Sequence, residues 1–188
     1  MDPFATALAS TADTFRALAT NEGYQQAVAR AIGLLSQALS TRHKALIFGN
    51  GGSAADAQHI AAELVGRFQK TRPAIAAIAL GTNHAYLTAW SNDADYSDVF
   101  ARELEALGAP GDVAWGITTS GNSPNVVKAL ARARERGLTT IALTGQGGGA
   151  AAAHADVLIA VPLAETARIQ EVHLVTYHHI CAAIEATR

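Results

Sequence analysis

The sequence contains a single cysteine, Cys181, among its 188 residues, so no disulfide can form within the chain. Disulfides support many small secreted domains, and their absence favours a reducing compartment. No apolar run approaches the roughly 20 residues that a membrane-spanning helix needs. The N-terminus carries Asp2 where a signal peptide would carry basic residues. We therefore expect a cytoplasmic protein that does not contact the membrane.

The chain also lacks a strong excess of positive or negative charge. The chain has 14 Lys and Arg against 16 Asp and Glu, a formal net charge of −2, and no basic run. Nucleic-acid binding depends on clustered Lys and Arg, so the sequence predicts no nucleic-acid partner. An anionic small substrate remains compatible with this charge, because backbone amides and hydroxyls can hold one phosphate without net positive charge.

The first forty residues predict a pair of helices. Asp2 and Pro3 have the pattern of an N-cap followed by proline at the first helical position. Apolar residues then recur at helical spacing, and a second amphipathic helix is expected over 22–40. Because this pair precedes the first strand, it packs either on the core or against another subunit.

From Lys44 onward, short apolar runs alternate with helical segments. Strands are expected over 45–48, 74–80, 112–118, 139–143 and 157–161. The intervening and following helices are expected from 53 to about 67, over 83–89, 95–107 and 125–136, and from about 166 to the C-terminus. This alternation predicts one α/β domain over residues 1–188, with a five-stranded, mostly parallel sheet covered by helices on both faces. Ligands in such folds bind at the carboxyl ends of the strands.

Two polar loops follow predicted strands. The first, Gly49-Asn50-Gly51-Gly52-Ser53, lets the backbone approach an anion at a helix N-terminus, although an ordinary tight turn explains it equally well. The second, 118–123, is rich in hydroxyls, which favours phosphate binding over a simple helix cap. The candidate ligand-binding residues of this second loop are Thr118, Thr119, Ser120 and Ser123.

Acid/base and metal-binding side chains lie on two predicted helices. His59 and Glu63 share one helical face at i,i+4 spacing, which suits a zinc site or proton transfer as well as a surface pair. The last helix carries Gln170 and three histidines, His173, His178 and His179, among which spacing alone does not choose. Asn92-Asp93 follows a predicted helix and could contact a sugar hydroxyl or form a turn.

These motifs resemble one known family. The segment GNGGSAADAQH at 49–59 and AAEL at 61–64 are similar to the phosphoheptose isomerases of the sugar-isomerase (SIS) domain superfamily. TSGNS at 119–123, ARIQEVH at 167–173 and Asn92-Asp93 match the same family. The resemblance covers nearly the whole chain from about residue 22, and the first and last motifs are long.

The resemblance implies a flavodoxin-like, three-layer SIS fold and a homotetramer that binds one Zn²⁺ per subunit. It implies conversion of D-sedoheptulose 7-phosphate into D-glycero-D-manno-heptose 7-phosphate for bacterial surface polysaccharides. Glu63 and His178 match the family's acid/base pair. The zinc ligands are matched by His59, Glu63, Gln170 and His178, and the substrate contacts by Asn50, Gly51, Gly52, Ser53, Glu63, Asn92, Asp93, Thr118, Thr119, Ser120, Ser123 and Gln170.

The sequence departs from the family pattern at two places. Thr118 stands where a serine is expected, which keeps the hydroxyl, and Leu163-Ala164-Glu165 replaces a segment that often carries serine and aspartate. Three alternatives to this enzyme share the resemblance: a non-catalytic paralogue that binds a replication initiator, an isomerase of another sugar phosphate, and a sugar-phosphate-sensing SIS domain. The presence of Glu63, Ser120 and His178 favours an enzyme over the scaffold, and residues 1–40 have too few Lys and Arg for a DNA-binding segment.

Overall fold

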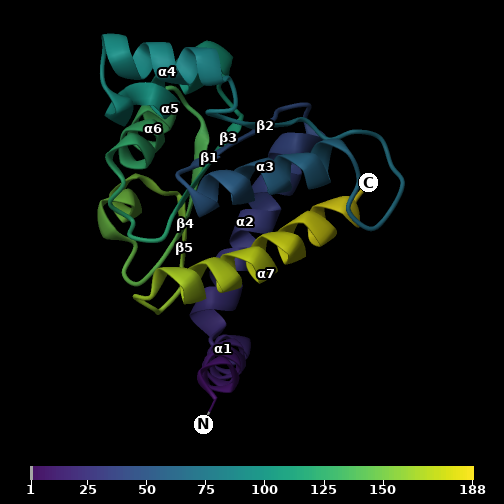
Figure 1. Ribbon diagram of the computed structural model, residues 1–188. Helices are drawn as coiled ribbons and strands as arrows, with labels where there is room; N and C mark the ends of the chain where they lie inside the picture. Colours follow the sequence, from purple (N-terminus) through teal and green to yellow (C-terminus); the bar gives the residue numbers. More distant parts are fainter. Residues whose placement is uncertain (1) are drawn as a thin grey trace.

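The computed structural model describes residues 2–188 and has a five-stranded sheet at its centre (Figure 1). The strand order is β2-β1-β3-β4-β5, and every neighbouring pair is parallel. The predicted α/β class and mostly parallel sheet are therefore confirmed. The strands are β1 (Ala45–Gly49), β2 (Ala77–Ala79), β3 (Val113–Thr118), β4 (Thr139–Thr144) and β5 (Val157–Ala160).

Helices cover both faces of the sheet and make three layers (Figure 1). One face packs against α2 (Glu22–Ser40), α3 (Gly52–Val65) and α7 (Thr166–Glu185). The other face packs against α5 (Val99–Leu107) and α6 (Pro124–Glu135), with α4 (His84–Asp93) beside α5. The remaining helices are α1 (Pro3–Ala19) and the short 3₁₀ helices η1 (Tyr96–Asp98) and η2 (Gly149–His154).

Alternating side chains of the central strands fill the two cores. Ile47 and Trp115 point into the core that α2, α3 and α7 cover, whereas Leu46 and Phe48 point into the core that α5 and α6 cover. Both faces of β1 and β3 are thus buried, which is why these strands read as continuous apolar runs and not as an alternating pattern.

The order of the strands creates a switch point between β1 and β3. These strands are adjacent and parallel, but α3 leaves β1 toward one face and α6 leaves β3 toward the other. The loops that follow the two strands therefore diverge, and a crevice opens between them. Both of the polar loops identified in the sequence lie at this position.

The segment between α3 and β2 differs from expectation. The helix ends at Val65 and not near 67, and the second strand is confined to Ala77–Ala79, whereas 74–80 was expected. The intervening chain is fixed by the guanidinium of Arg72, which donates to the carbonyls of Glu63 and Leu64 and pairs with the buried carboxylate of Glu185 at 3.2 Å. These bonds satisfy backbone carbonyls along an irregular segment. Helix and strand propensities do not predict such a segment.

The carboxylate of Glu185 also orders this segment from the far end of the chain. It accepts hydrogen bonds from the backbone N–H groups of Phe68, Gln69 and Lys70. Burial raises the pKa of Glu185, but these three donors and Arg72 outweigh burial and hold it below its usual value. The end of α7 is thereby joined to the loop that follows α3.

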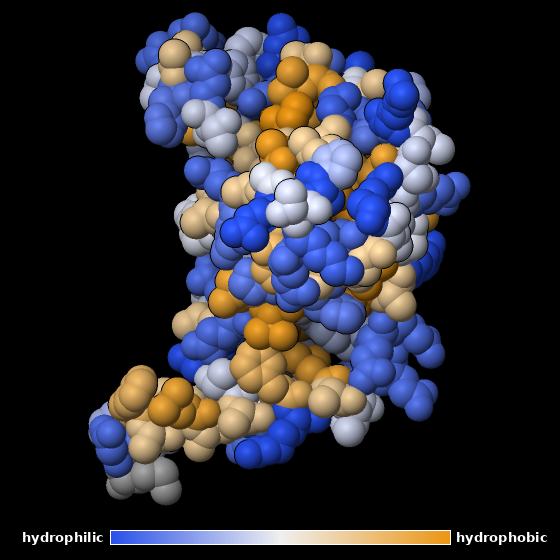
Figure 2. Space-filling view, turned by 90° about the vertical axis from the view of Figure 1, so that its right-hand side faces the viewer, coloured by the Kyte–Doolittle hydropathy of each residue, from blue (hydrophilic) through white to orange (hydrophobic). Residues whose placement is uncertain are grey.

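The two N-terminal helices differ in how much of their apolar surface is buried. The cap expected at Asp2 is present, because its side chain accepts from Phe4 N. Asn21, which the sequence analysis did not select, caps α2 by accepting from Tyr24 N. Helix α2 buries Ala31 and Leu35 in the core. Helix α1 extends as an arm from the body and carries hydrophobic surface (Figure 2). Its Phe4 and Leu8 side chains are 68% and 55% exposed. The N-terminal part of the apolar stripe of α1 is therefore uncovered within its own chain, whereas Phe15 and Leu18 near the other end pack against the body.

None of the helices within residues 2–188 combines the length and the hydropathy that crossing a membrane requires.

Candidate active site

A polar cavity of about 250 Å³ lies at the switch point. Ser53 and Thr118 line it and are almost fully buried. The first turns of α3 and α7 and the N-cap residue of α6, Ser123, contribute to its wall, so three helix N-termini converge there. Their N–H groups and dipoles favour an anion. The lining residues are Asn50, Gly52, Ser53, Ile117, Thr118, Thr119, Ser123, Thr166 and Gln170.

The second loop depends on glycine for its shape. Gly121 has a φ of +68°, and a Cβ there would clash with the carbonyl oxygen of Gly148. Ser120 is exposed and is not among the residues that line the cavity. Its hydroxyl accepts a hydrogen bond from Asn122 N at 3.1 Å. Within residues 2–188, Ser120 thus shapes the loop, and its predicted contact with substrate remains a prediction.

The first loop is held by an amide network that sequence reasoning missed. The side chains of Asn50 and Asn125 exchange two hydrogen bonds of 2.8 Å, and the Tyr96 hydroxyl donates to Asn50 at 2.9 Å. Asn125 is buried at the start of α6. The network therefore ties the loop after β1 to the helix after β3. Thr166, at the start of α7, was also missed, although a hydroxyl at a predicted helix N-terminus was a usable signal.

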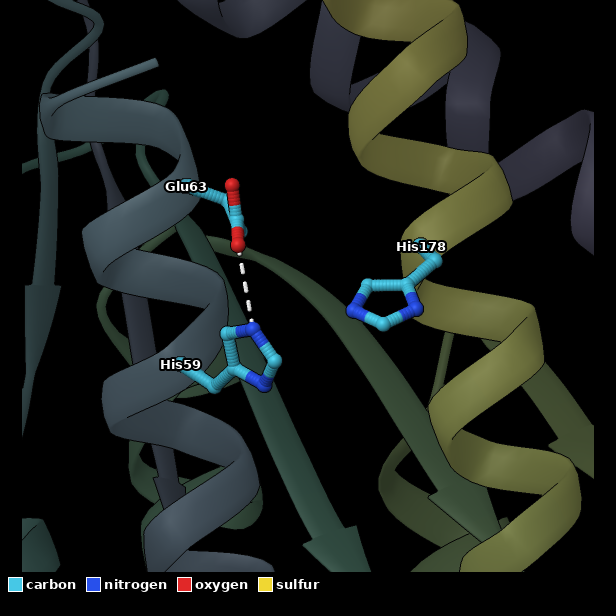
Figure 3. Close-up of side chains that lie close together, drawn as sticks. All are labelled: His59, Glu63 and His178. Carbon is cyan, nitrogen blue, oxygen red and sulfur yellow. Dashed lines mark hydrogen bonds and ion pairs between the residues drawn. The ribbon is translucent and has the colours of Figure 1, made fainter. Parts of the chain in front are cut away.

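His59, Glu63 and His178 form one cluster across α3 and α7 (Figure 3). His59 Nε2 and Glu63 Oε1 are 3.0 Å apart, as the i,i+4 spacing predicted. His178 reaches toward them from α7, and one potential ligand atom from each residue lies within 4.8 Å of the others. Two imidazoles and one carboxylate are a donor set that suits Zn²⁺, which usually takes four ligands in proteins. The structure thus selects His178 among the three histidines of the last helix.

Gln170 lies two turns before His178 on the same helix and lines the cavity. Its side-chain amide occupies the space that a Cβ on Gly52 would need, which explains glycine at that position. Helix α7 therefore contributes to both the cavity and the metal-type cluster. The role of Gln170 as a fourth zinc ligand stays a prediction.

Asn92 and Asp93 are placed differently from expectation. Helix α4 continues to Asp93, whereas the helix was expected to end near 89 with both residues in a following connection. Both side chains are exposed, and Asn92 donates to Asp93 at 2.9 Å. Neither residue lines the cavity within this chain, so their contact with substrate also stays a prediction.

Two aromatic residues that sequence reasoning did not select support the cluster. The ring of Phe68 stacks on that of His178 with centroids 5.3 Å apart. Tyr177, which is buried, places its hydroxyl 3.0 Å from His59 Nδ1 and 3.3 Å from Asp56 Oδ1. Burial raises the pKa of Tyr177 and that of Asp56, and the Tyr177 hydrogen bond opposes the effect on Asp56.

Two further titratable groups of α7 are buried in the core. Burial raises the pKa of Cys181 to about 12, with Glu63 adding to the shift, so the thiol is protonated and packed as expected. His173 is fully buried, and burial lowers its pKa to about 4 although the Thr144 carbonyl accepts from its Nε2. His173 therefore faces the sheet and not the candidate active site.

The burial of His173 predicts a pH-dependent stability. Its pKa is about 4 in the folded chain against 6.5 when exposed, so below pH 6.5 the unfolded chain binds a proton that the folded chain does not. Stability is therefore full above that pH and falls by about 3 kcal/mol as the pH drops to about 4. His173→Gln, which keeps a donor for Thr144, should flatten this part of the curve in urea titrations. An unchanged pH dependence, matching that of the exposed-site control His84→Gln, would contradict the assignment.

Comparison with known proteins shows which protein family the chain belongs to. Residues 9–145 match the family model described as SIS domain, so the chain is an SIS-domain protein. It is 52% identical over 168 residues to the phosphoheptose isomerase of Crocosphaera subtropica, covering 89% of this chain and 86% of that protein. The phosphoheptose isomerase of Aquifex aeolicus is also 52% identical, over 89% of this chain and 88% of that protein.

Solved structures agree with these relatives. The structure of a phosphoheptose isomerase from Neisseria gonorrhoeae superposes with a TM-score of 0.91 at 42% identity, with 97% of each chain covered. The chain is therefore an enzyme of the phosphoheptose isomerase family.

Proposed function

We propose that the protein is an aldose–ketose isomerase that converts D-sedoheptulose 7-phosphate into D-glycero-D-manno-heptose 7-phosphate for bacterial heptose synthesis. The observation that supports it most is the joint position of two sites on α3 and α7. These helices contribute to a hydroxyl-lined anion cavity, and they also bring together the cluster of His59, Glu63 and His178. A sugar phosphate bound by its phosphate in the cavity can extend its other end toward the cluster.

The residues of the cluster fit an enediol route. Such a reaction moves one proton between C1 and C2 and another between the two oxygens on these carbons. Glu63 is the base for the carbon-bound proton, because its carboxylate is only partly exposed and faces the cluster. His178 transfers the hydroxyl proton, since an imidazole exchanges protons near neutral pH.

The proposed metal is one Zn²⁺ per subunit, held by His59, Glu63, Gln170 and His178. The three residues of the cluster offer two nitrogens and an oxygen within 4.8 Å of one another, which is the chemistry that zinc prefers. When bound, zinc would polarise the substrate carbonyl and stabilise negative charge on its oxygen. The protein residues hold the sugar and move the protons.

The route is tested by isomerisation in D₂O. If Glu63 carries the proton between carbons, part of it exchanges with solvent, and deuterium appears at C2 of the aldose product. Nuclear magnetic resonance of the product measures this label. Product that forms without any deuterium would contradict an enediol route and favour direct hydride transfer.

The anion cavity predicts the effect of removing one hydroxyl. Ser53 lines the cavity at the start of α3 and is almost fully buried. Ser53→Ala should weaken substrate binding by about 1–2 kcal/mol, which is roughly a tenfold rise in KM, with a smaller effect on kcat. Ser36→Ala, the same change on the distant α2, should leave KM unchanged. Equal KM values for the two variants would place the phosphate elsewhere.

We also propose that the protein assembles with copies of itself, as a tetramer. An apolar groove of about 710 Å³ runs between α1, α2 and α7, next to the exposed hydrophobic face of α1. Figure 2 shows the arm extending away from the body of its own chain, with hydrophobic surface along it, and we infer that another copy covers this surface. Residues that line the groove include Phe15, Leu18, Tyr24, Val28, Ile32 and Val175. An apolar groove that continues into an exposed apolar helix face is a surface that another copy of the chain can cover.

Light scattering tests this assembly. The wild-type protein should have a mass four times that of one chain at micromolar concentration. Val175→Asp adds a charge to the groove and should reduce the mass, because burial of an unpaired carboxylate is unfavourable. Leu107→Asp adds the same charge at an exposed position on α5 and should not. A monomeric wild type would contradict the proposal.

A cytoplasmic location is proposed with this function. The one cysteine of the chain, Cys181, is buried and protonated, so folding does not depend on an oxidising compartment.

A further inference from the structure

A chain of hydrogen bonds lies behind the candidate metal site. Asp56 and His59 are one turn apart on α3, and Tyr177 reaches them from α7. The Tyr177 hydroxyl is 3.3 Å from Asp56 Oδ1 and 3.0 Å from His59 Nδ1. The other nitrogen of His59, Nε2, faces Glu63 and the shared centre of the cluster. Tyr177 therefore contacts His59 on the side away from the proposed metal.

The direction of these bonds follows from counting protons. A carboxylate only accepts, and the Tyr177 hydroxyl has one proton to give. Asp56 Oδ2 is buried and has no hydrogen-bond partner among residues 2–188, so the Tyr177 hydroxyl is the donor available to this carboxylate. If Tyr177 donated to His59 instead, Asp56 would be left with none at a cost of about 1–3 kcal/mol or more. Tyr177 thus donates to Asp56.

The tautomer of His59 then follows. With its proton directed at Asp56, the Tyr177 oxygen accepts a hydrogen bond from Nδ1–H of His59. Neutral imidazole carries one proton, so Nε2 is left with its lone pair. That lone pair and the Glu63 oxygen are 3.0 Å apart and repel each other in zinc-free protein. Both side chains are partly exposed, at 42% for His59 and 18% for Glu63, so water offsets this repulsion, whereas it does not reach the buried oxygen of Asp56. A cation bound between Nε2 and Glu63 would remove the repulsion.

We propose that Tyr177 is a positioning residue which, together with Asp56, holds His59 as the Nδ1–H tautomer and so presents Nε2 as a metal ligand. The inference rests on the proposed zinc site. It adds a role for two residues that do not contact the metal or the substrate. A partner of this kind fixes the ring and raises ligand basicity, and its loss typically lowers metal affinity 10–100-fold.

The test uses Tyr177→Phe, which keeps the buried ring and removes the hydroxyl. Its matched control is Tyr24→Phe. Tyr24 is a partly buried tyrosine that lies outside the cluster, and its hydroxyl is 2.7 Å from Thr176, the neighbour of Tyr177 on α7. Because Tyr24 lines the groove of the proposed assembly, both variants are compared at a concentration where light scattering shows the wild-type mass. Both variants lose one buried hydroxyl hydrogen bond to the same helix region. A loss of stability alone would therefore affect both alike.

Two measurements on the full chain decide the inference. Competition with a chromophoric chelator should show Zn²⁺ affinity about 10–100-fold weaker in Tyr177→Phe and unchanged in Tyr24→Phe. Nitrogen-15 spectra of zinc-free protein at about pH 8, where imidazoles are neutral, should show His59 protonated on Nδ1 in the wild type and Tyr24→Phe. In Tyr177→Phe this preference should be lost.

The outcomes separate this inference from the proposed function. Wild-type zinc affinity in Tyr177→Phe, or His59 protonated on Nε2 in the zinc-free wild type, would overturn the role of Tyr177 while leaving the zinc site standing. A wild type that binds no Zn²⁺ would overturn the zinc site and with it the ligand role of His59. In that case the nitrogen spectra would still decide whether Tyr177 sets the tautomer.

Discussion

Glu63→Gln and His178→Gln are each expected to lower turnover at least about 10²-fold, the usual scale for one acid/base group. Glutamine keeps the size and part of the hydrogen bonding of each side chain but cannot take up a proton. The two side chains face each other from α3 and α7 (Figure 3), so each change acts at the same centre. Steady-state kinetics on sedoheptulose 7-phosphate would measure the effect.

The effect on KM should be smaller than that on kcat, because the anion cavity is made by other residues. His179→Gln is the matched control for His178→Gln, since His179 is the next residue on α7 but is exposed and lines the groove beside α2. It should retain wild-type turnover under conditions that keep the assembly intact. Turnover that survives in both Glu63→Gln and His178→Gln would show that this pair does not carry the protons.

Removal of zinc is expected to have an effect of similar size. Stripping the protein with a chelator should lower turnover about 10²-fold or more, because a bound cation stabilises developing charge by several kcal/mol. Adding back Zn²⁺ should restore the activity. Metal analysis of protein prepared without chelator would give the stoichiometry, for which one ion per subunit is expected.

His59→Gln separates the metal from the proton-transfer role. His59 belongs to the cluster but is not assigned a proton in the reaction, so this change should weaken zinc binding and shift activity toward a dependence on added Zn²⁺. Glu63→Gln, by contrast, should stay inactive at every zinc concentration. Full activity in protein that binds no metal under any loading condition would remove zinc from the mechanism.

Much of the fold could be predicted because its signals are local. The apolar runs of β1, β3 and β4 and the cap of α1 depend on neighbouring residues, and α2 was expected with the bounds that it has. The path between α3 and β2 could not be predicted. It is fixed by Glu185, more than a hundred residues away in sequence, and such a long-range bond leaves no periodic pattern.

The candidate active site likewise has features that the sequence predicts and features that depend on tertiary packing. The pairing of His59 with Glu63 could be predicted from their helical spacing. The place of the two polar loops could be predicted because each loop comes directly after an apolar strand. The choice of His178 over its neighbours, and the contact of Tyr177 with His59, depend on how α7 is rotated against α3. That rotation is set by packing of the whole helix, so spacing within α7 could not reveal it.

The account is tested most directly by incubating the purified, zinc-loaded protein with sedoheptulose 7-phosphate and following the sugar by nuclear magnetic resonance. We predict that the anomeric proton of an aldoheptose phosphate appears with the wild type and is absent with the Glu63→Gln, His178→Gln double variant. A folded, zinc-loaded wild type that leaves the sugar unchanged would contradict the account, and it would favour a non-catalytic scaffold or a different sugar phosphate as substrate.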